Sequence, residues 1–398
     1  MKKILVINSG SSSLKFQLIS MPEETVIASG LVERIGMDDA KYSFESIKNK
    51  DTKILKILDH HQALELVAVF LLDIDLGVIS SPKEIDAIGH RVVHGGKHFS
   101  DTTLITNEIK DKIHQLASLA PLHNPPNLVG IEVSEKIFPD AKQIAVFDTA
   151  FHQSIPEKAH RYAIPKELYE NEHIRMYGFH GTSHKYVSEK ATAYLNNPKA
   201  KIIVLHLGNG CSATAINAGK SVEHSLGFGP LTGLVMGTRS GDIDPAIILY
   251  LMETKGYSYQ EISNLLNKKS GMLGLTGFSD MREIQKGYEN GNLDCEIALK
   301  MNAYRIKKYI GAYSAAMNGL DALVFTAGIG ENSSLLREMV CSEMDFLGIK
   351  LDDSKNKNKE KGIREIQSEV SKTKILVIPT NEELEIAKQS YALVNSKV

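Results

Sequence analysis

The chain has 398 residues, of which 42% are hydrophobic and 24% charged, and its formal net charge is −2. That length is enough for two domains of ordinary size, each with a core of its own. The nearly balanced charge excludes a nucleic-acid or membrane surface held by bulk electrostatics, so a bound anion has to be held by local groups.

Residues 4–7 predict a buried strand that runs into a tight turn of small residues and emerges as a second strand at 16–19. The design returns at 201–214, where Lys201 stands 198 residues after Lys3. A turn of Gly and Ser has no bulky side chains, so backbone N–H groups and hydroxyls can approach an anion directly. One such turn is more typical of an ordinary hairpin. Two of them, one in each half, predict a duplicated domain that closes on a nucleotide from both sides.

The predicted phosphate site is therefore a hairpin and not the start of a helix. The sequence contains no Gly-x-x-x-x-Gly-Lys-Ser/Thr loop, and no Gly-x-Gly-x-x-Gly follows the first strand.

The rest of the first half mixes helices and strands. Helices are expected at residues 60–75, 108–119 and 127–138, and strands at 85–90 and 143–147. Asn124 is the expected N-cap of the third helix, with Pro125 or Pro126 in its first turn. The last strand ends at Asp148, and the carboxyl ends of strands are where α/β proteins place their chemistry.

From about residue 151 the pattern restarts. A strand is expected at 202–207, a glycine-rich segment at 227–241, helices at 244–254, 259–268 and 294–317, and strands at 320–326 and 375–378. Residues 352–361 are dense in Lys, Asn and Asp, which predicts a solvated loop and not a binding patch. Residues 379–383 open a final helix with an acidic N-terminus, which is expected to pack back on the first domain.

The three cysteines, Cys211, Cys295 and Cys341, fit neither a disulfide framework nor a zinc site. The apolar start is too short for a signal peptide, and Asp73 and Asp75 interrupt the best candidate membrane span. We therefore expect a soluble cytoplasmic protein with reduced thiols that binds neither nucleic acid nor membrane.

Several clusters of polar and glycine residues carry the chemistry, at 8–15, 89–96, 120–126, 147–152, 177–184, 206–210, 236–245, 328–332 and 379–383. Together, and in this order along essentially the whole chain, they closely resemble the acetate kinase family. The resemblance implies the fold of the acetate and sugar kinase, Hsp70 and actin superfamily, an α/β architecture of two duplicated ribonuclease-H-like domains with an active-site cleft between them. It further implies a homodimer that uses Mg²⁺, with Mn²⁺ as an alternative, and ATP to convert acetate to acetyl phosphate and ADP.

By this resemblance the N-terminal domain comprises residues 1–150 with 381–398 and carries the magnesium and acyl sites. The C-terminal domain comprises 151–380 and carries the nucleotide site.

The residues also make chemical sense of this reaction. A carboxylate attacking a phosphoryl group is an anion meeting an anion, so the main requirements are charge neutralisation and alignment. Arg91 and Arg239 match the family's active-site arginines, and a guanidinium can hold carboxylate or phosphoryl oxygens by two parallel hydrogen bonds. Acetate is already ionised at neutral pH, so Asp148, also an active-site match, is expected to orient an arginine or the metal's waters and not to act as a base.

Two histidines are singled out only by their motif positions. His180 matches the family's contact to the transferred phosphoryl group, and His123 matches an active-site histidine of less defined role. Asn8 and Glu382 match the magnesium contacts, which suits an ion that takes few protein oxygens and keeps several waters. Alternatively, Glu382 only stabilises the N-terminus of the last helix through its negative charge. Glu383 is assigned this structural role.

The resemblance also assigns the nucleotide and acyl contacts. The nucleotide contacts are Ser11, Ser12, Lys15, His206, Leu207, Gly208, Asn209, Gly210, Asp280, Met281, Arg282, Gly328, Ile329, Gly330, Glu331 and Asn332. The acyl methyl group is expected against Val93, Leu122, Phe179 and Pro230, with Arg91 on the carboxylate. Such an apolar pocket discriminates poorly, because one methylene is worth only ~1–3 kcal/mol.

Two alternatives stay open. A propionate or butyrate kinase of the same family would differ mostly in the volume of the acyl pocket, and the bulky Phe179 and Leu122 favour the smaller acid. An ATP-driven conformational switch, which the superfamily also contains, would leave the acyl-site motifs without a purpose. Direct in-line transfer without a phosphorylated enzyme is the expected mechanism.

Overall fold

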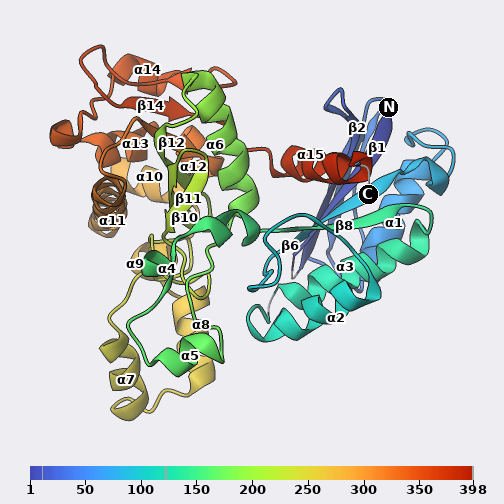
Figure 1. Ribbon diagram of the computed structural model, residues 1–398, viewed down its shortest axis with the longest axis horizontal. Coiled ribbons are helices and arrows are strands. Elements are labelled where there is room, and N and C mark those ends of the chain that lie inside the picture. Colours follow the sequence, from blue (N-terminus) through green and yellow to red (C-terminus); the bar gives the residue numbers. More distant parts are fainter. Residues whose placement is uncertain (11, 122, 397–398) are drawn as a thin grey trace. The chain divides into compact units, whose positions relative to one another are not determined.

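The computed structural model describes residues 1–10, 12–121 and 123–396 (Figure 1). Two of the predicted site residues, Ser11 and Leu122, lie outside this set. The chain forms two compact units, Met1–Phe151 with Asn381–Val398, and His152–Thr380. Each unit is built around one mixed sheet.

The first unit has an eight-stranded sheet in the order β5-β4-β3-β2-β1-β6-β8-β7. Its strands are β1 (Lys2–Ser9), β2 (Ser13–Met21), β3 (Thr25–Glu33), β4 (Lys41–Ser46), β5 (Lys50–Ile54), β6 (Ala87–Val92), β7 (Thr103–Leu104) and β8 (Lys142–Phe147). Strands β1 to β5 form an antiparallel meander, whereas β1, β6 and β8 run parallel. The helices are α1 (His60–Leu72), α2 (Asn107–Gln115), α3 (Asn124–Ile137) and α15 (Glu382–Asn395).

Strand β1 is buried on both faces, which is why residues 4–7 form an unbroken apolar run. Its side chains alternate: Leu5 and Ile7 belong to the core with α1 and the end of α3, and Ile4 and Val6 pack with Ile386 of α15. The final helix thus packs on the first sheet, as the sequence predicted. Gly89 of β6 makes this close approach possible, because a Cβ there would lie 2.7 Å from Ile386 Cγ2.

The second unit has a six-stranded sheet in the order β11-β10-β9-β12-β14-β13. Its strands are β9 (Lys201–Leu207), β10 (Cys211–Asn217), β11 (Lys220–His224), β12 (Ala322–Thr326), β13 (Arg364–Glu365) and β14 (Lys374–Val377). Its helices are α4 (Glu157–His160), α5 (Lys166–Glu170), α6 (Gly181–Leu195), α7 (Pro245–Glu253), α8 (Tyr259–Lys268), α9 (Gly271–Thr276), α10 (Met281–Glu289), α11 (Leu293–Met317), α12 (Ala327–Asn332), α13 (Ser334–Cys341) and α14 (Asp353–Lys357).

The two sheets share one topology. In each, three consecutive antiparallel strands (β1–β3, β9–β11) are followed on the side of the first strand by two strands parallel to it (β6 and β8, β12 and β14). Both glycine-rich turns lie at the same place, between the first and second strands of their sheet. The predicted duplication and the hairpin character of both turns are confirmed.

Two local predictions are wrong. Asn124 does not cap α3: it is the first residue inside the helix, and its amide instead bonds both backbone groups of His94. Residues 352–361 are not simply a solvated loop, because they include α14 and the buried Asn356, which holds Arg337. In both cases a side-chain amide, that of Asn124 or Asn356, forms hydrogen bonds with a residue distant in the sequence. The local sequence pattern had assigned the first amide to its own helix and the second to solvent.

All three cysteines are buried free thiols. Among the described residues no helix has the length and apolar character needed to cross a membrane.

Candidate active site

In the first unit, polar side chains gather where three neighbouring parallel strands end. Asn8 lies near the end of β1, Arg91 near the end of β6, and Asp148 directly follows β8. Glu382 is the first residue of α15, the helix that packs on these strands. Carboxyl ends of parallel strands and a helix N-terminus are both favourable positions for binding anions and metal-bound phosphates.

Arg91 is fixed by a bidentate contact. Its Nε and Nη2 atoms donate to Oδ2 of Asp148 at 2.9 and 2.5 Å, and its Nη1 donates to Oδ1 of Asn8 at 3.2 Å. The Asp148 side chain is 1% exposed and that of Arg91 22%. Asp148 therefore orients the guanidinium, and the partial exposure of Arg91 leaves it accessible to a ligand.

Glu382 carries an incompletely compensated negative charge. Burial, with Asp148 and Glu383 nearby, raises its pKa to about 7 in spite of the opposing effect of Arg91. A divalent cation would supply the missing positive charge, and the oxygens of Glu382 and Asn8 are the donor type that Mg²⁺ prefers. In the part of the chain that is described, no group of three or more His, Cys, Asp or Glu can hold a metal by itself. The residues thus fit an ion held by few protein oxygens together with water and phosphate.

Lys15 lies on β2 just after the first turn, and its Nζ pairs with Oε1 of Glu383 at 2.7 Å. Glu383 is 5% exposed, so this contact anchors an otherwise half-exposed lysine beside the turn. Ser12 is exposed in the turn itself. The turn is closed by Gly10, whose N–H donates to the carbonyl of Ser13 at 2.8 Å.

The N-terminus of α3 is attached to the ends of the same strands. Asn127 accepts from the N–H of Val93 at 3.0 Å and donates to the carbonyl of Ser9 at 2.7 Å. His123, partly exposed, is the N-cap residue of α3 without a side-chain cap bond. Asn124 and Asn127 are structural residues of this site that sequence reasoning did not assign. The only local signal was their position at a helix start, which does not reveal their distant partners.

In the second unit, His180 is held in an unusual backbone conformation just before α6. Its φ is +56°, in the left-handed region, and it follows Gly178 at φ +77°. Phe179 between them is bonded on both sides: its N–H donates to Nε2 of His224 at 3.1 Å, and its carbonyl accepts from Nε2 of His152 at 3.0 Å. A Cβ at Gly178 would lie 2.7 Å from the ring of His152, so glycine is required there. Two buried histidines therefore determine where His180 lies.

Ser212 connects His180 to a third buried histidine. Its Oγ lies 3.0 Å from Nδ1 of His180 and 2.7 Å from Nε2 of His184. Burial holds the pKa of His184, and that of His224, well below the ordinary value, so both rings are neutral. This hydroxyl fixes the plane of the His180 ring.

His206, predicted to contact the nucleotide, stacks on His180 with ring centroids 4.4 Å apart. Its Nδ1 lies 2.8 Å from Oγ of Ser183, and the residue is 8% exposed. From the sequence, His123, His180 and His206 were assigned to the site, and the supporting roles of His152, His184 and His224 were missed. The spacing of His180 and His184, one helical turn apart, was the available signal.

Arg239 lies close to His180 in the same unit. A Cβ on Gly210 would be 3.5 Å from Nε2 of His180 and 3.9 Å from Nη1 of Arg239. Arg239 donates to the carbonyl of Pro230 at 2.9 Å, and burial lowers its pKa. It has no carboxylate partner among the described residues, so its charge is available to an anion.

A cavity of about 700 Å³ opens in the second unit beside the turn after β9. Its lining residues are Asn209, Ser279, Asp280, Met281, Arg282, Gln285, Gly328, Ile329, Asn332 and Ser333. Seven of these ten were predicted to contact the nucleotide, and Ser279, Gln285 and Ser333 were not. Hydrogen bonds from Arg282 lower the pKa of Asp280 to about 2, so this carboxylate stays ionised. Asp280 is the N-cap of α10, and its side chain accepts from the backbone N–H of Arg282.

The other predicted nucleotide residues are placed differently. Leu207 has a buried side chain, and Gly208 and Gly210 form the turn, with a bond of 3.1 Å from the N–H of Gly208 to the carbonyl of Gly210. The carbonyls of Gly330 and Glu331 accept from Arg337 and are turned to a second cavity, described below. Of the predicted acyl residues, Val93 and Phe179 are buried and Pro230 is partly exposed.

The comparisons with known proteins agree over the whole chain. A model of the acetokinase family matches residues 3–388. The acetate kinase of Flavobacterium johnsoniae is 56% identical over 394 residues, which cover 99% of this chain and 100% of the relative.

Two solved structures are similarly close. The acetate kinase of Porphyromonas gingivalis has a TM-score of 0.93 at 45% identity and covers 99% of this chain and 100% of its own. A propionate kinase from Francisella tularensis gives the same TM-score and identity, with coverages of 98% and 100%. The fold is accordingly the actin-like ATPase fold of these enzymes, and the chain is a member of the acetokinase family.

Proposed function

We propose that the protein is an acetate kinase, which transfers the γ-phosphoryl group of ATP reversibly to acetate and forms acetyl phosphate and ADP. The observation that carries this proposal is the partly exposed Arg91, held by Asp148 at the strand ends beside Asn8 and Glu382, in a chain that matches the acetokinase family from end to end. An arginine held in this way can bind a carboxylate without giving up its own partner.

The first unit's residues act on the acid. Arg91 binds the acetate carboxylate and lowers its repulsion from the phosphoryl group, and Asp148 keeps the guanidinium in the required plane. No base is needed, because acetate is ionised at neutral pH. Val93 contributes apolar surface to the methyl group.

The second unit's residues act on the nucleotide. The cavity lined by Asn209, Asp280 and Ile329 takes the adenosine portion, since its volume suits a ligand of that size. The backbone of the turn at 208–210 approaches the phosphates, and by the resemblance to the family Lys15 is a further phosphate contact. His180 and the guanidinium of Arg239 hold the oxygens of the transferred phosphoryl group, where negative charge is greatest.

Asn8 and Glu382 would hold a divalent cation, which we assign as Mg²⁺. When bound, it would neutralise phosphate charge and align the reacting oxygens. We further propose that the enzyme works as a cytoplasmic homodimer, by the resemblance to its family.

Acetate is proposed as the preferred acid because Phe179 and Leu122 are bulky. The propionate kinase among the similar structures makes propionate the alternative, and a weaker substrate here. A hydroxamate assay for acyl phosphate, run with ATP and acetate, propionate or butyrate in turn, tests the proposal. The highest kcat/KM is expected for acetate; a preference for butyrate overturns the substrate assignment, and ATP turnover indifferent to any acid overturns the enzyme class.

The transfer is proposed to be direct, because the substrate is itself a competent nucleophile. A chiral γ-phosphate tests this step: inversion is expected, and retention would indicate two displacements through a phosphorylated enzyme.

A further inference from the structure

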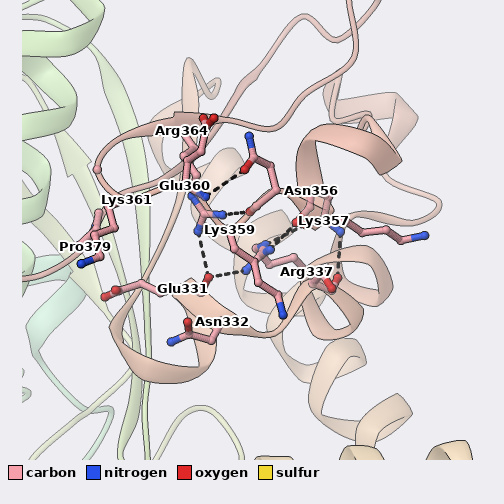
Figure 2. Close-up of a pocket in the computed structure, with 13 residues that line it drawn as sticks. Glu331, Asn332, Arg337, Asn356, Lys357, Lys359, Glu360, Lys361, Arg364 and Pro379 are labelled. Atoms are coloured by element: carbon pink, nitrogen blue, oxygen red, sulfur yellow. Dashed lines mark hydrogen bonds between the residues drawn. The ribbon is translucent and has the colours of Figure 1, made fainter.

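The second unit contains another cavity, of about 560 Å³, which includes only Glu331 and Asn332 of the predicted nucleotide contacts. It is lined by the end of α12, by α13, by β13 and by the segment 356–362, which begins in the last turn of α14 (Figure 2). It shares only Asn332 with the lining of the proposed nucleotide cavity. Its charged residues are the cations Arg337, Lys357, Lys359, Lys361 and Arg364 and the carboxylates Glu331 and Glu360.

Arg337 is a buried cation, and no carboxylate among the described residues forms an ion pair with it. It is 2% exposed, and its guanidinium donates only to neutral oxygens: the side chain and carbonyl of Asn356 at 2.8 and 2.7 Å, and the carbonyls of Gly330 and Glu331 at 2.9 and 3.0 Å. Burial, reinforced by the neighbouring Arg364, lowers its pKa to about 10. A buried charge is normally paired with an opposite one, so this arrangement leaves net positive charge beside the cavity.

Arg364 adds a second guanidinium of the same kind. Its Nη1 and Nη2 atoms donate to the carbonyls of Asn358 and Glu331, and its Nε is buried and makes no hydrogen bond in the described residues. Figure 2 shows both arginines reaching toward the same stretch of backbone. Two adjacent guanidiniums bonded only to carbonyls form a rigid positive wall.

The remaining cations are exposed. Lys357, Lys359 and Lys361 are exposed, and within the described part of the chain none of the three forms an ion pair. Lysines on the rim of a cavity with a rigid cationic wall can close on an anion of variable shape.

We propose that this cavity is a binding site for a small phosphate-bearing anion, separate from the catalytic site. The wall supplies fixed positive charge, the three lysines supply up to nine N–H donors, and the volume admits a ligand of several phosphate groups or a phosphorylated metabolite. The site follows from the placement of its own residues and does not depend on the catalytic assignments.

Inorganic pyrophosphate, in metal-free buffer, is the probe. Acylation of each lysine by an N-hydroxysuccinimide ester, followed by peptide mass spectrometry, reports occupancy at the site itself. Pyrophosphate is expected to protect Lys357, Lys359 and Lys361 at concentrations that leave Lys255, Lys268 and Lys269, exposed lysines of the same unit, unprotected.

Calorimetry with two matched triple variants gives the second readout. Lys357→Gln/Lys359→Gln/Lys361→Gln and Lys255→Gln/Lys268→Gln/Lys269→Gln remove the same charge and leave the catalytic residues intact, so any pyrophosphate bound at the catalytic site is common to both. The first variant is expected to weaken one binding event by about tenfold or more, which corresponds to about 1.4 kcal/mol. Equal losses in both variants, or equal protection of both lysine sets, would overturn the proposal, as would an absence of protection at millimolar pyrophosphate.

Discussion

The contact between Arg91 and Asp148 allows a sharp test of how the candidate site works. Asp148→Asn keeps the shape of the side chain but removes its charge, so Arg91 loses a bidentate, charge-assisted partner at 2.5 and 2.9 Å. Breaking a buried ion pair by removing one partner costs about 3–5 kcal/mol. Arg91 is 22% exposed and therefore partly screened, so the lower end, about 3 kcal/mol, applies here.

If these ~3 kcal/mol are lost from the stabilisation of the transition state relative to free enzyme and acetate, kcat/KM decreases by roughly two orders of magnitude. The stronger test is a double-mutant cycle with Arg91→Ala, measured as kcat/KM for acetate in the hydroxamate assay. Since Asp148 is argued to act through Arg91, Asp148→Asn should cost little more once Arg91 is absent.

Two outcomes would refute this reasoning. Near-normal kcat/KM in Asp148→Asn would mean that the pair does not orient the arginine for catalysis. Fully additive losses in the double variant would mean that Asp148 acts on the substrate or the metal by itself. Thermal unfolding of all three variants is the control that separates misfolding from lost activity.

Three further predictions follow from the structure. Ser212→Ala should lower kcat by roughly ten- to hundredfold, because the ring of His180 is no longer fixed. The matched control is Ser225→Ala, which removes another buried hydroxyl, one that accepts a hydrogen bond from a backbone N–H of the same sheet, and should leave kcat unchanged. Similar kcat values for the two variants would argue against the role of Ser212. Burial lowers the pKa of His90 from 6.5 to about 4, so the unfolded chain binds the proton more tightly and stability is lost as the pH falls from 6.5 toward 4. In urea titrations at pH 4, the His90→Gln variant should therefore retain about 3 kcal/mol more of its neutral-pH stability than the native protein does. Parallel profiles of stability against pH for the two proteins would contradict this. Mg²⁺ should raise the melting temperature of the native protein and EDTA should reverse the gain, while Glu382→Gln should abolish most of it; an undiminished gain in that variant would remove Glu382 from the metal site.

Local pattern predicted the elements of this fold well where a segment's environment is uniform along its length. Residues 4–7 are apolar without interruption because β1 is covered on both faces. The helix α8 was predicted with its observed bounds, Tyr259–Lys268, and in the structure Ser258 and Glu261 form a capping box at its start. The duplicated turn was readable because it recurs in the sequence with the same small residues.

The candidate site was only partly readable. Asn8, Arg91 and Asp148 come together because parallel strands end at one edge of the sheet, a consequence of topology that their motifs anticipated. The partners of Asn124 and Asn127 were not predicted, since these amides bond to backbone groups that lie 30 and 118 residues away.

By itself, then, the sequence determined the duplicated α/β pattern, the order of its strands and helices, and the residue types that suit a reaction between two anions. Only the tertiary structure decided which histidines support His180, and that Arg337 is buried beside a cationic cavity with no ion pair to a carboxylate of the described residues. The physical reason is that periodicity and turn chemistry act over a few residues and are written locally. Hydrogen-bond partners and uncompensated charges instead depend on which distant backbone groups the folded chain brings into contact.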